Sequence, residues 1–325
     1  MATVPSLDVF TRARRDRRRV VVLTAYDVMT ARLAARGGVD ALLVGDSLGQ
    51  VILGHDSTLP VTMDDMVHHT RAVTRAGTGL PVIADLPYGS FHVDPRETVR
   101  AGLSLVQEGG AQAVKLEGGR RRQDHLAALL DAEIPVMGHL GLTPQSINRL
   151  GGYKVQGRRE DAARELLDEA AFLAESGCFA MVLECIPAAL AAQITAAVGV
   201  PTIGIGAGGD CDGQVLVFHD LLGLLDDFQP KFVKRYAELG RDAADAIAAF
   251  GDEVRRGTFP GPEHTYDQWH AAAEALLKGA PFEKRLVSKT YEDITIQPIY
   301  RREDIANLET RKDFPGSGSL VRGSH

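Results

Sequence analysis

Eight short apolar runs, separated by amphipathic stretches, fill most of the first 220 residues of this 325-residue chain and constrain its fold more than any other feature. Each run is rich in Val, Ile, Leu or Ala at successive positions, which is typical of a parallel strand that is covered on both faces. A stretch between runs, such as residues 162–177, has helical periodicity and closes on glycine. The eight runs are VVVLTAYD (20–27), DALLVGDS (40–47), LPVIADLP (80–87), AQAVKLEGG (111–119), IPVMGHLG (134–141), FAMVLECIP (179–187), VPTIGIGAG (200–208) and GQVLVFHD (213–220).

The regular alternation of strand and helix predicts a parallel α/β fold. Eight strand–helix units favour a closed (β/α)8 TIM barrel over an open doubly wound sheet, which usually has about five or six strands. No Gly-x-Gly-x-x-Gly follows the first run, which further disfavours a dinucleotide-binding fold. We therefore predict a TIM barrel.

Composition excludes several classes of protein. A formal net charge of −7 does not suit a nucleic-acid-binding surface, and no apolar run approaches the roughly 20 residues that a membrane helix needs. The three cysteines, Cys178, Cys185 and Cys211, lack zinc-like spacing, and their odd number excludes complete disulfide pairing. We expect a cytoplasmic protein, and we interpret the basic run at residues 12–19 as a solvated helix face rather than a targeting segment.

The strand–helix rhythm stops near Pro260, so we expect a catalytic barrel over residues 1–264 and a non-catalytic extension over residues 265–325. Residues 267–278 are typical of a helix that begins at Asp267 and ends at Gly279. Residues 293–300 alternate like an edge strand or an extended arm, and a proline within them excludes a central strand. Residues 306–325 carry too little apolar material to form a core.

Polar side chains stand at the predicted carboxyl ends of the strands, where TIM barrels carry their active sites. These side chains are Asp27, Asp46, Ser47, Asp85, Lys115, Glu117, His139, Glu184, His219 and Asp220. Since carboxylates at short range repel one another, so many at one barrel mouth indicate a cation between them. Oxygen ligands without cysteine or clustered histidine favour Mg²⁺ over zinc, with Asp46, Asp85 and Glu117 as candidate ligands.

Two of these candidate ligands have a structural alternative. Asp46 and Asp85 could cap the helices that follow, the commonest role of Asp after a strand. Neither is followed directly by a helical pattern, which weakens that alternative.

Glu184 could form an ion pair at its strand end. Its apolar neighbours instead favour a general acid or base with a raised pKa. Lys115 shares strand parity with Glu117, so the two are either an ion pair or an anion-binding and metal-binding pair. His139 lies between glycines that let a ligand approach the backbone, and its alternative is a buried structural histidine.

Nine motifs, taken in order, resemble the ketopantoate hydroxymethyltransferase family from about residue 20 to residue 264. They are TAYD (24–27), VGDSLG (44–49), GHDSTLPVT (54–62), ADLP (84–87), KLEGG (115–119), GHLGLTPQS (138–146), GGYKVQGR (151–158), LECIP (183–187) and IGIGAG (203–208). The resemblance implies a barrel of the phosphoenolpyruvate/pyruvate superfamily and a homo-oligomer, decameric in bacterial members. It also implies Mg²⁺-assisted transfer of a hydroxymethyl unit from 5,10-methylenetetrahydrofolate to 3-methyl-2-oxobutanoate, which gives 2-dehydropantoate for pantothenate synthesis.

The resemblance carries residue roles onto matching positions of this chain. Asp46, Asp85 and Glu117 are implied to hold Mg²⁺, and Asp46, Ser47, Asp85 and Lys115 to form the substrate site. Glu184 is implied to be the proton acceptor. His139 is expected to orient the substrate or to donate a hydrogen bond.

Two alternatives to this function stay open. One is a Mg²⁺-dependent lyase or phosphonomutase of the same superfamily, and the other is a barrel scaffold whose tail binds a protein partner. Residues 265–323 resemble the N-terminal arm of a methylmalonyl-CoA mutase subunit, but no D-x-H-x-x-G cobalamin motif occurs in the chain. We therefore expect either an interaction arm or a fusion remnant there, and no cobalamin chemistry.

Overall fold

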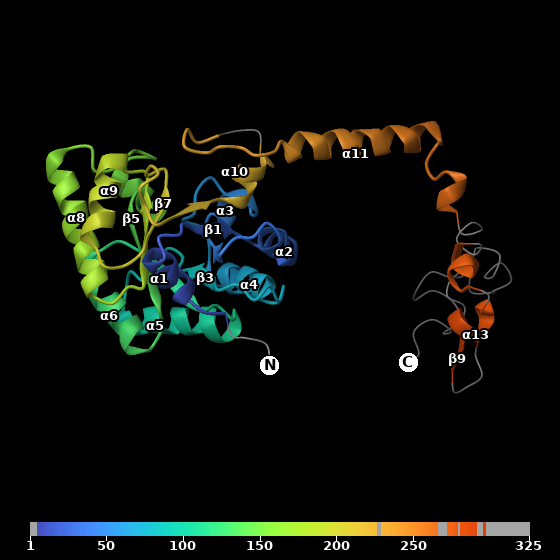
Figure 1. Ribbon diagram of the computed structural model, residues 1–325, viewed down its shortest axis with the longest axis horizontal. Helices are drawn as coiled ribbons and strands as arrows, with labels where there is room; N and C mark the ends of the chain where they lie inside the picture. The colour runs from blue at the N-terminus through green and yellow to red at the C-terminus, as the bar shows by residue number, and fades with distance from the viewer. Residues whose placement is uncertain (1–4, 226–228, 266–271, 279, 291–294, 297–325) are drawn as a thin grey trace, which may run out of the picture. The chain divides into compact units, whose positions relative to one another are not determined.

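The computed structural model describes residues 5–225, 229–265, 272–278, 280–290 and 295–296. Eight parallel strands form a closed barrel, each paired with the next along the chain and the last paired with the first (Figure 1). The strands are β1 (Val20–Thr24), β2 (Ala41–Val44), β3 (Val82–Asp85), β4 (Ala113–Glu117), β5 (Val136–Gly141), β6 (Ala180–Glu184), β7 (Thr202–Ile205) and β8 (Gly213–Leu216). All eight predicted strands, and with them the TIM barrel, are confirmed.

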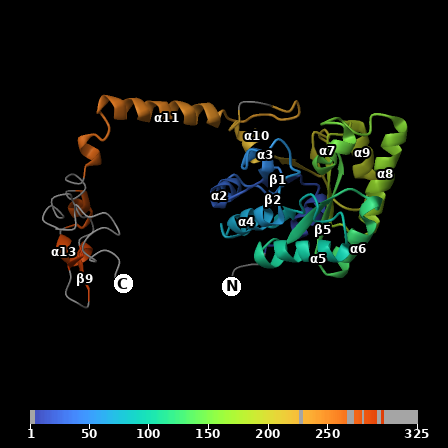
Figure 2. The same ribbon diagram turned by 180° about the vertical axis from the view of Figure 1, so that it is seen from behind.

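Helices surround the barrel strands, as the views from both sides show (Figures 1 and 2). They are α2 (Val28–Arg36), α3 (Leu48–Val51), α4 (Met63–Thr74), α5 (Pro95–Leu103) with a π-helical turn at Ser104–Glu108, α6 (Gln123–Asp131), α7 (Ile147–Leu150), α8 (Glu160–Glu175), α9 (Ala188–Ala197) and α10 (Phe218–Leu222). Asp27 caps α2, since its carboxylate accepts a hydrogen bond from the Thr30 backbone N–H at 2.7 Å. Asp27 is thereby accounted for as a structural residue.

Side chains of the strands alternate between two buried clusters. One cluster fills the barrel and includes Val22, Leu43, Ile83, Ala113, Met137, Val182, Ile203 and Val215. Their strand neighbours, such as Leu23 and Leu42, lie between the strands and the helices. Alternate residues of a strand point to opposite faces. The residue two positions beyond each of these barrel residues, toward the carboxyl end of its strand, therefore also faces the inside of the barrel. Those positions are Thr24, Gly45, Asp85, Lys115 followed by Glu117, His139, Glu184, Ile205 and Val217, all of which line one cavity.

Helix α1 (Asp8–Arg15) packs on the apolar cluster inside the barrel through Phe10, which is fully buried. The guanidinium of Arg14 donates hydrogen bonds to the backbone carbonyls of Thr195 at 3.0 Å and Val198 at 2.7 Å. The prediction of a solvated basic face is therefore wrong for Arg14, because carbonyls at the end of α9 need donors and this side chain supplies them.

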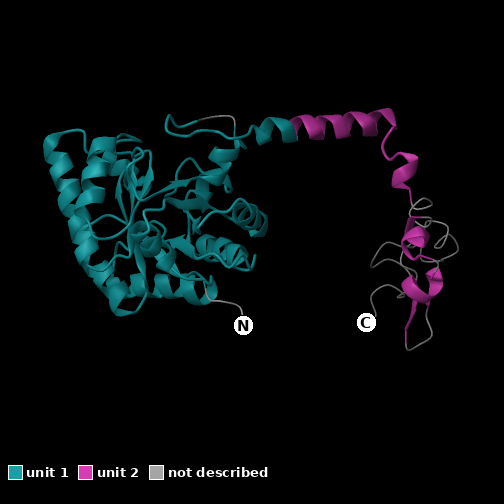
Figure 3. Ribbon diagram, viewed as in Figure 1, with its two compact units in different colours: residues 1–243 teal, residues 244–325 magenta. Residues whose placement is uncertain are grey.

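The chain forms two compact units, residues 1–243 and residues 244–325 (Figure 3). Helix α11 (Leu239–Arg256) spans the division between them, and none of its residues is buried. The predicted boundary of the catalytic domain at residue 264 stays a prediction. No described helix is both long enough and apolar enough to cross a membrane.

Part of the predicted extension is described. Residues 272–276 are helical, as expected, whereas the predicted ends of that helix at Asp267 and Gly279 lie outside the described residues. Helix α13 (Phe282–Leu286) was not predicted, and a short antiparallel pair joins β9 (Ser288–Lys289) to β10 (Thr295–Ile296). The expected arm over residues 293–300 is described only at β10.

Candidate active site

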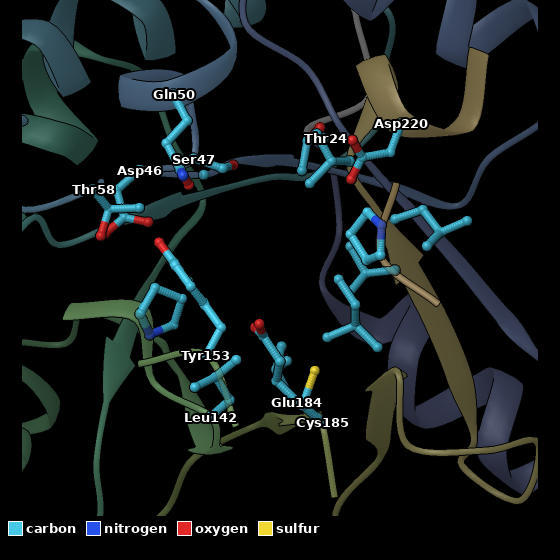
Figure 4. A pocket seen from close by; sticks show the side chains of 18 of the residues that line it. Thr24, Asp46, Ser47, Gln50, Thr58, Leu142, Tyr153, Glu184, Cys185 and Asp220 are labelled. Atoms are coloured by element: carbon cyan, nitrogen blue, oxygen red, sulfur yellow. The ribbon is translucent and has the colours of Figure 1, made fainter. Parts of the chain in front are cut away.

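A cavity of about 840 Å³ opens at the carboxyl ends of the barrel strands (Figure 4). The apolar side chains of Leu43, Val182 and Val215 belong both to the cluster inside the barrel and to the lining of the cavity. The structure brings every predicted site residue to this cavity: Asp46, Ser47, Asp85, Lys115, Glu117, His139 and Glu184.

Asp46 and Asp85 lie beside each other at the ends of β2 and β3. The backbone N–H of Asp46 donates to Asp85 Oδ2 at 3.0 Å, and both residues are buried. Helix α3 begins at Leu48, closer to Asp46 than we expected, yet no side-chain hydrogen bond caps it. The helix-cap alternative is therefore not what the structure shows for either aspartate.

Lys115 connects the carboxylates to the histidine. Its Nζ lies 3.2 Å from Asp85 Oδ1 and 3.1 Å from His139 Nδ1, and the side chain is buried. Burial alone would lower the pKa of Lys115, but the charges of Asp85, Glu117 and Asp46 outweigh it and raise that pKa. Lys115 is thus a fixed positive charge, and its close ion-pair partner is Asp85 rather than Glu117.

The contacts of His139 define its tautomer. A lysine ammonium can only donate, so Nδ1 accepts from Lys115 and the ring proton lies on Nε2. Nε2 is 3.2 Å from Glu184 Oε2, although the pair does not have hydrogen-bond geometry. Burial, and then the charge of Lys115, hold the pKa of His139 well below its usual value, so the ring is neutral.

Glu184 ends β6 and faces the cavity with 16% of its side chain exposed. Burial raises the pKa of its carboxyl to about 7, against the opposing charge of Lys115. A carboxyl group with a pKa near neutrality can both take up and release a proton. Its backbone carbonyl accepts from Leu142 N–H at 2.8 Å, and the next residue, Cys185, donates to the Ile205 carbonyl at 2.8 Å. Both flanking strands therefore hold this carboxylate in place.

Several residues in the lining of the cavity or directly behind it were given no role from sequence. Tyr26 is fully buried, and its hydroxyl lies 2.9 Å from Ser47 Oγ, the predicted substrate-binding hydroxyl. Thr58 is buried, and its Oγ1 has no hydrogen-bond partner among the described residues. The side chain of Tyr153 extends toward the Asp46 side of the cavity (Figure 4). Each belongs to a motif quoted above, so the motifs contained the signal, but strand-end position alone could not find residues on loops.

The carboxylates fit a hard divalent cation. Burial and the neighbouring Asp85 raise the pKa of Asp46 to about 7, and burial and Asp46 raise that of Glu117 well above its usual value. A cation would favour the charged forms. Among the described residues, no three Asp, Glu, His or Cys side chains form a ready-made metal site. Mg²⁺ usually binds only one or two carboxylates directly and keeps several waters, so the donor set fits Mg²⁺ without direct contact from all three side chains.

Comparison with known proteins points to one family. Residues 5–262 match the family described as ketopantoate hydroxymethyltransferase. The 3-methyl-2-oxobutanoate hydroxymethyltransferase of Oleidesulfovibrio alaskensis is 55% identical over 255 residues, 78% of this chain and 88% of that protein. That of Pelobacter propionicus is 53% identical over 265 residues, 82% of this chain and 97% of that protein.

The fold also has a likeness among solved structures. The crystal structure of 2,3-dimethylmalate lyase, a PEP mutase/isocitrate lyase superfamily member, aligns with a TM-score of 0.51. The alignment covers 83% of this chain and 96% of the lyase at 18% identity, which supports the fold alone. The family match ends at Pro262 and gives no support to the resemblance of the tail to a mutase arm.

Proposed function

The chain belongs to the ketopantoate hydroxymethyltransferase family, and from this premise we propose the reaction that its cavity performs. It transfers a hydroxymethyl unit to 3-methyl-2-oxobutanoate. The carbon comes from 5,10-methylenetetrahydrofolate and the hydroxyl oxygen from water, and the products are 2-dehydropantoate and tetrahydrofolate. The observation that carries this proposal is the convergence, in one cavity, of a carboxyl with a pKa near 7, a buried lysine and three further carboxylates.

The proposed metal site consists of Asp46, Asp85 and Glu117. Mg²⁺ held by these oxygens supplies electrostatic stabilisation for charge that develops on the keto oxygen of the substrate. The protein contributes a site with little exposure to solvent, since all three carboxylates are buried and each lies at or just beyond a strand end.

Lys115 and Ser47 are the proposed contacts to the 2-oxo acid. Lys115 remains charged, and its ion pair with Asp85 holds the ammonium group in place. The side chain therefore need not move before its positive charge acts on the substrate. Ser47 is oriented by the buried hydroxyl of Tyr26. The aliphatic side chains of Leu43, Val182 and Val215 offer an apolar surface to the branched end of the substrate.

Glu184 is the proposed base that removes the proton from C3 of the substrate. Its pKa near 7 places the carboxylate in the useful range for proton transfer at neutral pH. His139 is neutral, and its Nε2 lies 3.2 Å from Glu184 Oε2, so we assign it the role of positioning the base by close contact. The resulting carbanion equivalent attacks the one-carbon unit, and the cavity is large enough for two substrates at once.

The test is turnover of 3-methyl-2-oxobutanoate with 5,10-methylenetetrahydrofolate and Mg²⁺, beside Asp46→Ala and Glu184→Gln. We expect 2-dehydropantoate from the parent, and loss of product in both variants and on chelation. A parent that cleaves a related 2-oxo acid without any folate would contradict the proposal and favour the lyase alternative.

We also propose that the chain works in the cytoplasm as a homo-oligomer, without nucleic-acid or membrane partners. The family resemblance supports assembly, with a decamer as the expected form. Sedimentation of the full chain tests this proposal, and a monomer at micromolar concentration would contradict it.

A further inference from the structure

Gln145 lies at the centre of the carboxylate cluster and has no role in the proposal above. It belongs to a 3₁₀ turn, Pro144–Ser146, that closely follows β5, and it is buried. Its side-chain Nε2 donates to Asp46 Oδ2 at 2.8 Å and to the Leu86 carbonyl at 2.9 Å. Its backbone N–H donates to Glu117 Oε2 at 3.1 Å. One residue therefore contacts two of the three proposed metal ligands.

Each hydrogen bond that Gln145 donates to a carboxylate involves only one of its two oxygens. Gln145 engages one oxygen of Asp46, Oδ2, and one oxygen of Glu117, Oε2. Glu117 Oε1 lies 3.7 Å from His139 Nδ1, which is beyond hydrogen-bond distance. Asp46 in turn donates its backbone N–H to Asp85, so all three carboxylates are connected through short contacts. Only the contact with Asp46 depends on the side chain of Gln145, because the contact with Glu117 comes from the backbone N–H.

The side-chain oxygen of Gln145, Oε1, also supports a role beside a cation. This oxygen is buried and has no hydrogen-bond partner among the described residues. A cation at Asp46 and Glu117 that keeps part of its water shell would present O–H donors to such an acceptor. The side chain thus offers a donor to the carboxylates and an acceptor to hydrating water.

We propose that the Gln145 side chain is a positioning group of the magnesium site and sets its affinity by fixing the Asp46 carboxylate beside Glu117. The inference rests on the metal site proposed above. Residues behind the direct ligands of a metal commonly change its affinity about 10–100-fold. The competing explanation is a purely structural role, in which Gln145 only ties its turn to the Leu86 carbonyl.

Metal affinity of the full chain separates these two roles. Mg²⁺ binding is measured by calorimetry, and Mn²⁺ binding by electron paramagnetic resonance, on metal-free parent, Gln145→Met and Gln145→Asn. Met keeps the volume and removes both polar groups, whereas Asn keeps them but is too short to reach Asp46. The matched control is Gln50→Met, because Gln50 lines the same cavity and its amide faces the Asp56 carbonyl instead of a carboxylate.

We expect the Kd for both ions to rise at least about tenfold in both Gln145 variants and to stay within about twofold in Gln50→Met. Parent-like affinity in a folded Gln145 variant, with only a lower melting temperature, would overturn the inference and establish the structural role. A parent that binds neither ion would overturn the metal site itself. A parent that binds both ions while all variants match it overturns only the role of Gln145. If Gln145→Met does not fold, Gln145→Asn decides the question.

Discussion

Glu184 should determine how the reaction rate depends on pH. Its carboxyl must be ionised to accept a proton, and its pKa is raised by burial to about 7. We therefore expect kcat/KM to fall as the pH drops through about 7, with one proton taken up. Glu184→Gln should lower kcat by about 10²–10⁴-fold and abolish that acidic limb. Rate profiles between about pH 5.5 and 8.5 provide the check, and an unchanged limb in the variant would assign it to another group.

The same carboxyl should also affect stability, with a definite sign. Its pKa is about 7 in the folded chain against an ordinary value of 4.5. The stabilising contribution is full below the ordinary value and is lost as the pH rises through 7, because the folded chain must then bury a charge. Metal-free Glu184→Gln should therefore exceed the parent in free energy of unfolding by roughly 1–3 kcal/mol at about pH 8, and by little near pH 4.5. Urea titrations at both pH values measure this difference in unfolding free energy. A difference of the same size at both pH values would contradict the prediction.

At the scale of the element, the last residue of β5 should be intolerant of a side chain. Gly141 has a φ of +94°, and a Cβ there would lie 2.1 Å from the Glu184 carbonyl oxygen. Gly141→Ala should therefore push the base out of place, cost more than about 2 kcal/mol and lower kcat. Gly152→Ala is the matched control, since its φ is +112° and nothing lies within 4 Å of the added atom. Equal losses of stability and rate in the two variants would show that backbone strain alone is responsible.

Strand periodicity explains why so much of the site was predictable. Lys115 and Glu117 continue the inward parity of Ala113, so the sequence pattern that buries the barrel core also directs them to the cavity. Gln145 and Thr58 have no such periodicity to mark them, because they lie in irregular segments. The position of Gln145 depends on hydrogen bonds to Asp46 and Leu86, which are distant in sequence, and no local pattern reports such bonds.

Helix α1 precedes the first barrel strand, so the alternation of strands and helices did not predict its packing. Its fully buried Phe10 packs edge-on to Phe179 at 5.4 Å between ring centres. Phe10→Ala should cost about 3–5 kcal/mol of unfolding free energy, whereas Thr11→Ala, at an exposed position of the same helix, should cost under about 1 kcal/mol. Urea unfolding of the two variants checks the prediction. Similar small losses would show that α1 contributes little to the barrel.

For the whole molecule, the question is whether the barrel works without its extension. Every described residue that lines the cavity lies between Thr24 and Phe232, within the first compact unit. Deletion of residues 265–325 should therefore leave kcat and KM within about twofold of the parent. Steady-state kinetics of the shortened chain tests this, beside sedimentation of both chains. Lost turnover with intact assembly would move the catalytic boundary beyond the predicted residue 264.

The sequence pattern predicts a catalytic boundary at residue 264 and contains no signal for a division of the chain at residue 243. The division at residue 243 falls within α11, a helix with continuous amphipathic periodicity and no local break at that point. Only tertiary contacts distinguish its two halves, and these are absent from a linear pattern.

The pairing of β1 with β8 has a consequence for synthesis of the chain. Val20 pairs with Gly213, so 193 residues separate the two strands that close the barrel. At about 5–20 residues per second, a ribosome needs roughly 10–40 s to deliver the last strand after the first has emerged. Throughout that interval β1 has an open edge, which is prone to pair with other nascent chains. Chaperones that cover this edge at the exit tunnel should therefore raise the yield of the folded barrel.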